Sequence, residues 1–304
     1  MPMPRLPARF EGDPEPLSID LHMHSTASDG ALSPEALVAL CRERGLTHMA
    51  LTDHDTLAGV PEATAAAALQ GIVLMAGTEL STQWRGHNIH VVGLLPEGAR
   101  GPLVEGLVAQ AQARERRALK IAERLEKIGL ADALARAREQ AGSERPLGRP
   151  DFARALVAAG LVPDVGIAFK KHLGDGKAGD VKSLWPQIAE AVSWIVAAGG
   201  VAVLAHPLRH GLTRRKRGLL LDDFREAGGQ AAELVSGFQN ADATRDLARQ
   251  LQERELYASL GSDFHFPGGH LAPGSMSPVP RTATPPVWTH PRLAACFGAP
   301  VNTS

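Results

Sequence analysis

Histidines and carboxylates recur along the sequence at short spacings that suit metal binding. The first motif is His22-Met23-His24, which is followed by Asp29. Residues two apart in a strand face the same side, so a strand over this motif would present both imidazoles to one point. A pair of surface histidines on a half-exposed strand explains the motif equally well. Taken alone, the motif leaves both interpretations open.

The second motif is Thr52-Asp53-His54-Asp55, directly after the apolar run MAL and before a helical pattern. In an α/β barrel this is the carboxyl end of a strand, where catalytic side chains collect. His54 is interpreted as a metal ligand, and Thr52 and Asp55 as supporting or capping groups. The alternative is a polar turn in which Asp53 or Asp55 caps the helix.

Two further candidates come from the next predicted strands, GIVLMAGTELS and HNIHVVGLL. Glu79 follows so apolar a stretch that burying its carboxylate is costly unless the group is paired or binds a metal. A carboxylate can also bridge two cations, which an imidazole cannot do. His90 lies inside the second strand and is interpreted as a ligand, whereas His87 precedes the apolar stretch and is left out.

The last two motifs follow the apolar runs GVAVL and LYASL. They are Ala205-His206-Pro207 and Gly261-Ser262-Asp263-Phe264-His265, and Asp263 and His265 are predicted to share one face of a strand. Together the five motifs offer more ligands than one cation can use. Mixed carboxylate and imidazole donors suit Mn²⁺, Zn²⁺ or Fe, and the absence of cysteine from the motifs argues against a structural zinc site.

Clustered divalent cations are the arrangement that hydrolytic phosphoesterases use to hold the attacking and leaving oxygens. The motifs therefore predict a metal-dependent phosphoesterase. Two or three divalent ions are expected, with Mn²⁺ preferred and Zn²⁺ or Fe as alternatives.

Strands and helices must alternate to bring these motifs together. The segment SPEALVALCRERG predicts a helix with Ser33 as N-cap, Pro34 at its first position and Gly45 as terminator. The segments VPEATAAAALQG and WPQIAEAVSWIVAAGG predict two more helices, and AAELVSG predicts a late strand. Such alternation favours parallel βαβ units, and an α/β barrel is compatible with the length of the chain.

The pattern changes over residues 99–184, which contain almost no strand signal and predict a helical insertion that caps the active site. The predicted barrel is therefore discontinuous, over residues 17–98 and 185–266. Residues 1–16 are predicted to form a flexible leader, and residues 267–304 a proline-rich, loop-rich tail.

Composition narrows the class of protein further. A hydrophobic content of 44% supports a full core, and a net charge of −1 argues against a general nucleic-acid binder, although a local basic patch is possible. The aromatic content of 4% argues against base-stacking platforms made of several aromatics. Cys41 and Cys296 are too few and too far apart for a disulfide framework or a zinc finger, and free thiols are expected.

No apolar run approaches the roughly 20 residues that span a bilayer, and the first residues lack the apolar stretch of a signal peptide. The sequence therefore predicts a soluble, cytoplasmic protein. It gives no sign of membrane association or of an obligate protein partner.

The five motifs, in this order, resemble the PHP (polymerase and histidinol phosphatase) superfamily over residues 18 to about 267. The resemblance implies a distorted, TIM-like (β/α)7 barrel with two or three metals at its carboxyl-terminal mouth. Carried over by position, the first metal would be held by His22, His24, Glu79 and Asp263, the second by Glu79, His90 and His206, and the third by Asp29, His54 and His265. Glu79, His206 and Asp263 would position a metal-bound water for attack on phosphorus.

The insertion after His90 resembles a subgroup that contains the 3′,5′-nucleotide bisphosphate phosphatase and a 5′→3′ exoribonuclease of short RNA. The similar stretches are GRPDFARALVAAG, FKKHLGDGKAG and AVLAHPLRHGLT. This resemblance implies that Arg149, Lys177 and Arg209 bind substrate phosphate, for which a guanidinium is well suited. Arg149 and Arg209 could instead pair with local carboxylates.

Some positions depart from that subgroup. Asp151 stands where a histidine is usual, Asp180 replaces an aromatic residue, and His210 replaces a tyrosine. These changes spare the metal motifs and bear on substrate preference. The basic run from Arg214 to Arg217 either reaches toward an RNA tail or is a solvated surface run.

The resemblance implies hydrolysis of the 3′-phosphate of nucleoside 3′,5′-bisphosphates such as adenosine 3′,5′-bisphosphate. It also implies, with or instead of this activity, removal of 5′ nucleotides from short 5′-phosphorylated RNA or DNA. A small-molecule phosphatase like histidinol phosphatase and a non-catalytic PHP metal-binding module are the alternatives. The basic helical insertion argues against the first, and the complete ligand set argues against the second. The general acid is left open.

Overall fold

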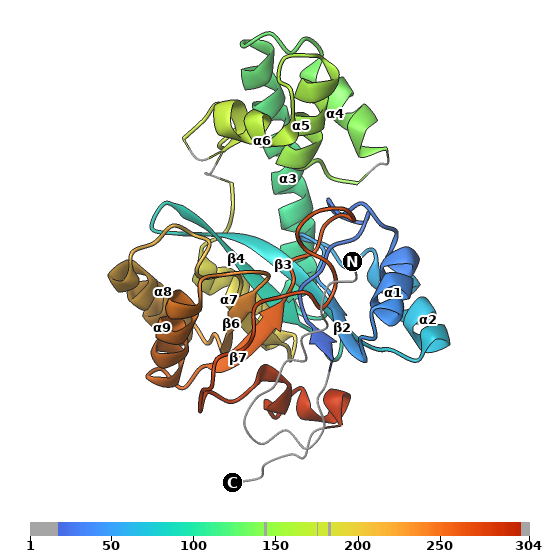
Figure 1. Ribbon diagram of the computed structural model, residues 1–304. Helices are drawn as coiled ribbons and strands as arrows, with labels where there is room; N and C mark the ends of the chain where they lie inside the picture. Colours follow the sequence, from blue (N-terminus) through green and yellow to red (C-terminus); the bar gives the residue numbers. More distant parts are fainter. Residues whose placement is uncertain (1–17, 143–144, 175, 182–183, 299–304) are drawn as a thin grey trace. The chain divides into compact units, whose positions relative to one another are not determined.

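The computed structural model describes residues 18–142, 145–174, 176–181 and 184–298. The chain divides into two compact units (Figure 1). We call Met1–Gly106 together with Pro186–Ser304 the barrel unit, and Leu107–Trp185 the insertion unit. The predicted leader, residues 1–16, lies outside the described residues.

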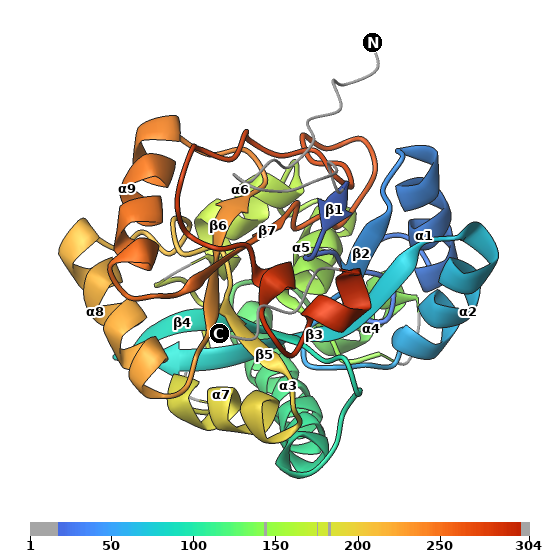
Figure 2. The same cartoon turned by 90° about the horizontal axis from the view of Figure 1, so that it is seen from below.

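The barrel unit is built on one sheet whose seven strands follow chain order. The strands are β1 (Ile19–Asp20), β2 (His48–Leu51), β3 (Val73–Trp84), β4 (His87–Leu94), β5 (Val201–Leu204), β6 (Ala231–Ser236) and β7 (Tyr257–Gly261). The two edges meet, because the Leu21 amide donates to the Leu260 carbonyl at 3.1 Å and Met23 forms a parallel bridge with Phe264. This mixed α/β, nearly closed barrel confirms the predicted fold class (Figure 2).

The direction of β4 corrects the expectation of parallel strands. β4 pairs antiparallel with both β3 and β5, whereas the other neighbouring strands pair in parallel. Arg85 and Gly86 join β3 to β4 with φ angles of 46° and 79°. Two residues can connect only antiparallel neighbours, and positive φ at both positions is typical of such a hairpin turn.

Helices cover the outside of this barrel (Figure 2). They are α1 (Pro34–Glu43), α2 (Val60–Gln70), α7 (Ile188–Ala197), α8 (Arg214–Glu226) and α9 (Ala241–Gln252). The predicted start of α1 is confirmed, because the Ser33 hydroxyl accepts a hydrogen bond from the Ala36 amide at 3.1 Å and Pro34 is the first helical residue. Gly45 ends the segment with a φ of 79°. None of the helices in the described residues is long and apolar enough to cross a membrane.

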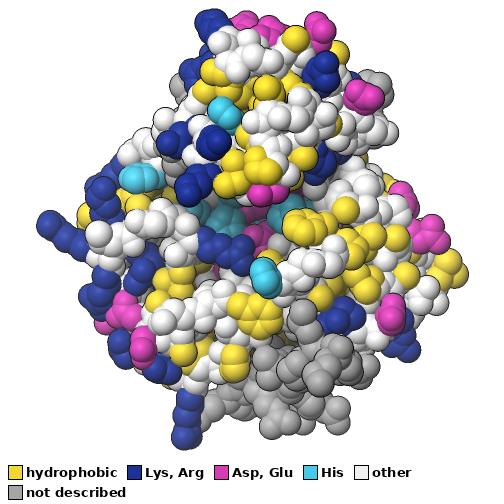
Figure 3. All heavy atoms as spheres, turned by 45° about the horizontal axis from the view of Figure 1, so that its top comes forward, with side chains coloured by type: hydrophobic (Ala, Val, Ile, Leu, Met, Phe, Trp, Pro, Cys, Tyr) yellow, Lys and Arg dark blue, Asp and Glu magenta, His cyan; other side chains and the backbone are white. Residues whose placement is uncertain are grey.

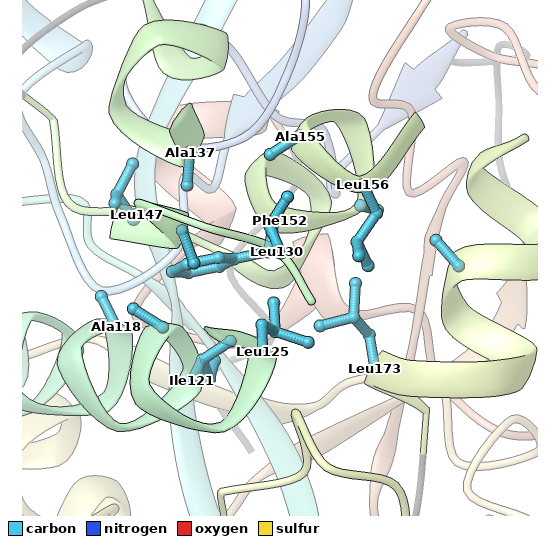
Figure 4. Packing of buried hydrophobic residues seen from close by; sticks show 14 of the residues in the cluster. Ala118, Ile121, Leu125, Leu130, Ala137, Leu147, Phe152, Ala155, Leu156 and Leu173 are labelled. Atoms are coloured by element: carbon cyan, nitrogen blue, oxygen red, sulfur yellow. The ribbon is translucent and has the colours of Figure 1, made fainter. Parts of the chain in front are cut away.

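The insertion unit consists of helices around its own apolar core. Its elements are the continuation of α3 (Pro102–Glu126), then α4 (Ala133–Ala141), α5 (Arg149–Ala158), α6 (Val165–Ala168) and the π-helix η1 (Phe169–Leu173). Phe152 lies at the centre of the core, among Leu125, Leu130 and Leu147 (Figure 4). Within the described residues 107–185 there is no strand, in keeping with the missing strand signal.

The segment predicted as a loop-rich tail packs against the barrel as far as it is described. It contains two short 3₁₀ helices, η2 (Val287–Thr289) and η3 (Ala294–Phe297), and the Trp288 side chain is buried. The Ala258 amide of β7 donates to the Pro285 carbonyl at 2.8 Å. Short 3₁₀ turns lack the periodicity of an α-helix, which explains why the sequence pattern did not reveal them.

Candidate metal centre

Side chains from seven separate segments of the barrel unit converge on one cluster of histidines and carboxylates. Figure 3 shows histidines (cyan) gathered beside acidic side chains (magenta). Three groups in the described residues could hold a metal, with their ligand atoms within 4.8 Å of one another: His22, His24, Glu79 and Asp263; His24, Asp29, His54 and His265; His54, Glu79 and His90. Such buried clusters are consistent with a site for several metals.

The first group coincides with the set predicted for the first metal. The Nε2 atoms of His22 and His24 lie 3.1 Å apart, and each lies 3.2 Å from Oε2 of Glu79. Oδ1 of Asp263 lies 3.5 Å from the first of these nitrogens and 3.3 Å from the second. Four ligand atoms therefore face one point.

The two histidines lie just beyond β1, which ends at Asp20. The bridge between Met23 and Phe264 holds this segment beside the residues that follow β7, so the two imidazoles still point to the same side. Both side chains are fully buried. The interpretation of His22 and His24 as a surface pair is therefore wrong.

Glu79 lies at the centre of the cluster. Its Oε1 is 2.9 Å from Nδ1 of His90 and 2.9 Å from Nε2 of His206. Its Oε2 is 3.1 Å from Nδ1 of His54 and faces the first group. The residues predicted for the second metal thus meet at one oxygen of Glu79, while the other oxygen faces the first group.

The residues predicted for the third metal, Asp29, His54 and His265, also come together. Asp29 Oδ1 lies 3.4 Å from Nε2 of His265, and Asp29 Oδ2 lies 3.8 Å from Nε2 of His54. The ring of His24 stacks on that of His265 at 4.1 Å between centroids. This group therefore adjoins the first one through His24.

Supporting side chains hold the loops that carry these groups. Asp53 accepts hydrogen bonds from the Ser25 amide at 2.8 Å, the Ser25 hydroxyl at 2.7 Å and the Ser28 hydroxyl at 2.6 Å, and so fixes the loop before Asp29. Asp55 accepts from the amide and the hydroxyl of Ser81 at 2.7 and 2.9 Å. The Thr52 hydroxyl donates to the Met23 carbonyl at 3.1 Å. Thr52 and Asp55 thus take supporting positions, as predicted.

One geometric expectation about the last motif is wrong. Asp263 and His265 do not share the face of a regular strand, because β7 ends at Gly261 and Asp263 has a φ of 56°. This left-handed residue turns the backbone, which an extended strand cannot do. The two side chains nevertheless meet, with 3.7 Å between Oδ1 of Asp263 and Nδ1 of His265.

The charges of the cluster favour a cation. Burial raises the pKa of Glu79, but the neighbouring His22, His90 and His54 outweigh it and hold this pKa well below its usual value. Burial lowers the pKa of His24, but the neighbouring carboxylates of Asp263 and Glu79 raise it to about 10. The Glu79 carboxylate therefore stays ionised, and in the absence of metal His24 supplies positive charge beside it.

Unsatisfied polar atoms test whether divalent ions fit these residues. Oδ1 of Asp29 and Oε2 of Glu79 are buried and have no hydrogen-bond partner of acceptable geometry in the described part of the chain. A buried acceptor without a partner is costly. Both oxygens belong to the metal-binding groups, and cations placed there would satisfy them. The residues present thus fit metal ions.

Glu233 is a residue of this site that the sequence analysis missed. This buried carboxylate, on β6 beside an irregularity in strand pairing, lies 2.5 Å from Nδ1 of His22 and accepts the His206 amide at 2.6 Å. It fixes a proton on Nδ1 of His22, so that Nε2 faces the cluster. A single acidic residue within AAELVSG was the available signal.

Arg209, predicted to bind phosphate, lies beside the cluster. Its Nη1 donates to Oδ2 of Asp263 at 2.5 Å, and its Nη2 donates to the Ser236 carbonyl at 2.9 Å. In this structure it therefore pairs with a local carboxylate. His210, the next residue, is placed with a ring nitrogen 3.0 Å from the Ala205 carbonyl, and burial holds its pKa well below the usual value. His210 is thus a neutral structural group.

Arg149 and Lys177 belong to the insertion unit. Arg149 donates to the Leu173 carbonyl at 3.1 Å and places its guanidinium over the Phe169 ring. The amide of the exposed Lys177 ends a turn by donating to the Gly174 carbonyl at 3.0 Å. The structure thus brings these two predicted phosphate ligands into neighbouring segments, and Arg149 is not paired with a carboxylate in the described residues.

The unusual residues of the insertion have structural partners. Asp151 is fully buried and accepts hydrogen bonds from Arg145 at 2.7 and 3.0 Å, from Arg154 at 2.5 Å and from the Gly148 amide at 2.8 Å. These contacts cap α5 and neutralise the carboxylate. Asp180 accepts from the Gly176 amide at 2.8 Å and so closes the turn around Lys177.

The basic run at the start of α8 is partly paired. Arg214 and Arg217 each donate to Asp246 of α9 at 2.9 Å, and Arg217 is buried. Arg215 and Lys216 are exposed. Half of the run therefore joins two helices, which favours the surface interpretation over contact with an RNA tail.

The chain as a whole resembles several known proteins. The PHP domain model matches residues 20–98. The chain is 43% identical to the 5′-3′ exoribonuclease of Haemophilus influenzae, over 88% of this chain and 97% of that protein. It is 40% identical to the 3′,5′-nucleoside bisphosphate phosphatase of Chromobacterium violaceum, over 89% and 95% of the two chains.

A solved structure resembles the whole chain as well. It is an amidohydrolase from Chromobacterium violaceum with bound sulfate and no metal, 39% identical, with a TM-score of 0.84 over 92% of this chain and 96% of that one. These similarities extend far beyond the matched domain. The chain therefore belongs to the PHP domain family, which confirms the resemblance seen in its motifs.

Proposed function

We propose that this chain is a metal-dependent phosphoesterase that acts on nucleotides. Its substrates are nucleoside 3′,5′-bisphosphates, which lose the 3′-phosphate, and short 5′-phosphorylated RNA or DNA, from which 5′ nucleotides are removed. One relative is named a 5′-3′ exoribonuclease and the other a 3′,5′-nucleoside bisphosphate phosphatase, and both align over nearly their full length. The single observation that carries the proposal is the convergence of three metal-binding groups on Glu79, Asp263 and their imidazoles.

The nine predicted ligands hold two or three divalent ions in this proposal. Carboxylate oxygens mixed with imidazole nitrogens suit Mn²⁺, Zn²⁺ and Fe. Of these, Mn²⁺ is the preferred candidate, with Zn²⁺ or Fe as alternatives. When bound, such ions would make a water molecule more acidic and offset the negative charge of the phosphoryl group.

The side chains of the barrel unit then have distinct tasks. Glu79 joins the groups, because its two oxygens face different imidazoles. Glu233 fixes the ring of His22. Arg209 donates two hydrogen bonds at the edge of the cluster, where a phosphate oxygen can replace an acceptor and form a charge-assisted bond.

Arg149 and Lys177 bind the second phosphate of the substrate in this proposal. The support comes from Arg149, whose guanidinium is fixed by one carbonyl and one ring and keeps further N–H donors for a ligand. Arg149→Ala and Lys177→Ala are expected to raise KM for a bisphosphate more than KM for a monophosphate. Equal changes for both substrates would remove these two residues from the phosphate site.

A substrate panel with added Mn²⁺ tests the function directly. It contains adenosine 3′,5′-bisphosphate, short 5′-phosphorylated RNA and DNA, simple monophosphates and histidinol phosphate. We expect turnover of the nucleotides, and its loss in His22→Ala and Asp263→Ala. Preferred turnover of histidinol phosphate, or undiminished activity in both variants, would contradict the proposal. Metal analysis of the same preparations separates an enzyme from a module that only binds metal.

A further inference from the structure

Two phenylalanines lie on the surface of the barrel unit, whereas the other described Phe, Tyr and Trp side chains are buried or half-buried. Phe238 is 52% exposed and Phe266 is 59% exposed. They follow β6 and β7, which are neighbours in the sheet, and they stand at the carboxyl ends where the metal-binding groups gather. Large exposed apolar side chains beside a candidate active site point to a ligand with apolar faces.

The backbone around Phe238 holds this ring outside. The Gly237 amide donates to the Gly261 carbonyl at 2.8 Å, and the Gly237 carbonyl accepts the Ser277 amide at 3.0 Å. On the other side, the Gln239 amide donates to the Ser277 hydroxyl at 2.9 Å, and the Gln239 side chain donates to the Leu234 carbonyl at 2.6 Å. Because both neighbours are anchored, the ring is presented to solvent with little backbone freedom left to lose on binding.

Phe266 is placed by a metal-binding group. It directly follows His265, whose carbonyl accepts the Ala31 amide at 2.7 Å. The Phe266 ring lies close to the backbone of Gly269, where an added Cβ would stand 3.1 Å from a ring carbon. The glycine therefore gives the ring room beside the loop.

Arg209 connects the two phenylalanine segments to the cluster. A Cβ added to Gly237 would lie 2.7 Å from Nη2 of Arg209 and 2.7 Å from Cδ2 of Leu271. The guanidinium, the turn before Phe238 and the loop after Phe266 thus meet at one glycine. The same guanidinium donates to Asp263. The Arg209 guanidinium, which can bind phosphate, therefore lies at the same corner of the barrel mouth as the segments that carry Phe238 and Phe266.

We propose that Phe238 and Phe266 form a base-binding site, which takes the nucleobase of the substrate while its phosphates bind at the metal cluster and Arg209. The inference rests on the proposed function. It adds a binding site for the nucleobase, which the metal cluster does not contact when it binds the phosphates. Stacking uses the π face that every base has, so the site is expected to accept purines and pyrimidines alike. The low aromatic content argued against such a site, but two exposed rings suffice for it.

The test compares a substrate that has a base with one that lacks it. Phe238→Ala and Phe266→Ala are assayed on adenosine 3′,5′-bisphosphate and on its abasic tetrahydrofuran analogue. We expect each change to raise KM for the adenosine substrate about tenfold, with kcat and the abasic substrate little affected. Phe238→Leu and Phe266→Leu keep apolar area without a π face and should show most of the loss. Leu69→Ala, at an exposed leucine of α2, is the control.

A binding measurement gives a second readout. Quenching of 1,N6-ethenoadenosine 5′-monophosphate by stacking is expected with the wild-type chain and should weaken in both alanine variants. Variants with unchanged circular dichroism and Mn²⁺ content, but with KM raised equally for both substrates or not at all, would overturn the base site and leave the proposed function standing. A wild-type chain that hydrolyses neither substrate would instead refute the proposed function, and the base site with it.

Discussion

The barrel unit and the insertion unit treat buried charge in opposite ways. In the insertion, both oxygens of the buried Asp151 carboxylate accept hydrogen bonds, from Arg145, Arg154 and a backbone amide. In the barrel, Asp29 and Glu79 each keep a buried oxygen with no hydrogen-bond partner in the described residues. The first arrangement satisfies the carboxylate with fixed partners, whereas the second leaves oxygens that face only imidazoles and that a cation can bind. The contrast places the candidate chemistry in the barrel. The buried charge of the insertion is structural, so the insertion can contribute to function only through groups on its surface.

Removal of Glu79 tests the barrel side of this contrast and has the largest expected effect. Glu79→Ala takes away the carboxylate shared by two metal-binding groups. Mn²⁺-supported hydrolysis is expected to fall roughly 1,000-fold, which is a loss of several kcal/mol of transition-state stabilisation. Chelation of the wild-type chain should have the same result. His87→Ala is the matched control, since His87 is not part of any metal-binding group in the described residues. Activity that survives in Glu79→Ala would show that the cluster is not catalytic.

Removal of Asp151 tests the insertion side. Asp151→Ala removes the only carboxylate paired with the largely buried Arg145 guanidinium among the described residues, and we expect the free energy of unfolding to fall by about 3 kcal/mol in urea denaturation. Arg225→Ala breaks the exposed pair with Glu255 and should have little effect. Mn²⁺ binding by the folded Asp151→Ala chain should not change. A loss of metal affinity there would contradict the division of tasks between the units.

Glu233→Gln sharpens the contrast inside the barrel, because Glu233 has protein partners and yet serves the cluster. The amide can keep the geometry but not the charge that makes His22 a better ligand. We expect Mn²⁺ affinity to fall about 10- to 100-fold in a calorimetric titration. Ser193→Ala on the surface of α7 should leave it unchanged. An affinity equal to that of the wild type would mean that Glu233 only fills space.

The smallest expected effect concerns pH. Burial lowers the pKa of His24, but the neighbouring carboxylates of Asp263 and Glu79 outweigh it and raise this pKa from 6.5 to about 10 in the metal-free chain. Its contribution to stability is therefore complete below pH 6.5 and is lost as pH rises toward 10. The melting temperature of the metal-free chain should fall over this range, by about 2–4 °C for each kcal/mol lost. Saturating Mn²⁺ should reduce the decline. A metal-free melting temperature that rises over this range would disprove the assignment.

Much of the fold was predictable because its signals are local. Ser33, Pro34 and Gly45 mark the two ends of α1, and each acts through its own backbone. The reversal of β4 also has a local signal, in the turn at Arg85-Gly86, but the sequence interpretation followed the alternation of strands and helices and missed it. The packing of Trp288 had no such signal, because it depends on contacts with distant parts of the chain.

In the site, too, residues with a local signal were predictable, whereas those that depend on distant contacts were not. His22, Glu79 and Asp263 were identified because each follows or interrupts an apolar strand, which is a visible pattern. Glu233 interrupts one as well, but its partners are His22 and His206, which are far away in sequence. Its role depends on the register of β6 in the barrel, and a single sequence does not contain that information. Binding roles for Arg149, Lys177 and Arg209 still stand as predictions.

The two-residue turn between β3 and β4 also bears on the order in which the chain assembles. A hairpin with so short a turn has a small entropic cost of closure, so it can form as soon as its residues leave the ribosome. It carries Glu79 and His90. His206, which lies 2.9 Å from Glu79 in the finished fold, is synthesised 127 residues later. Half-built copies of the protein therefore hold an incomplete set of ligands, and tight metal capture marks a chain whose barrel has closed.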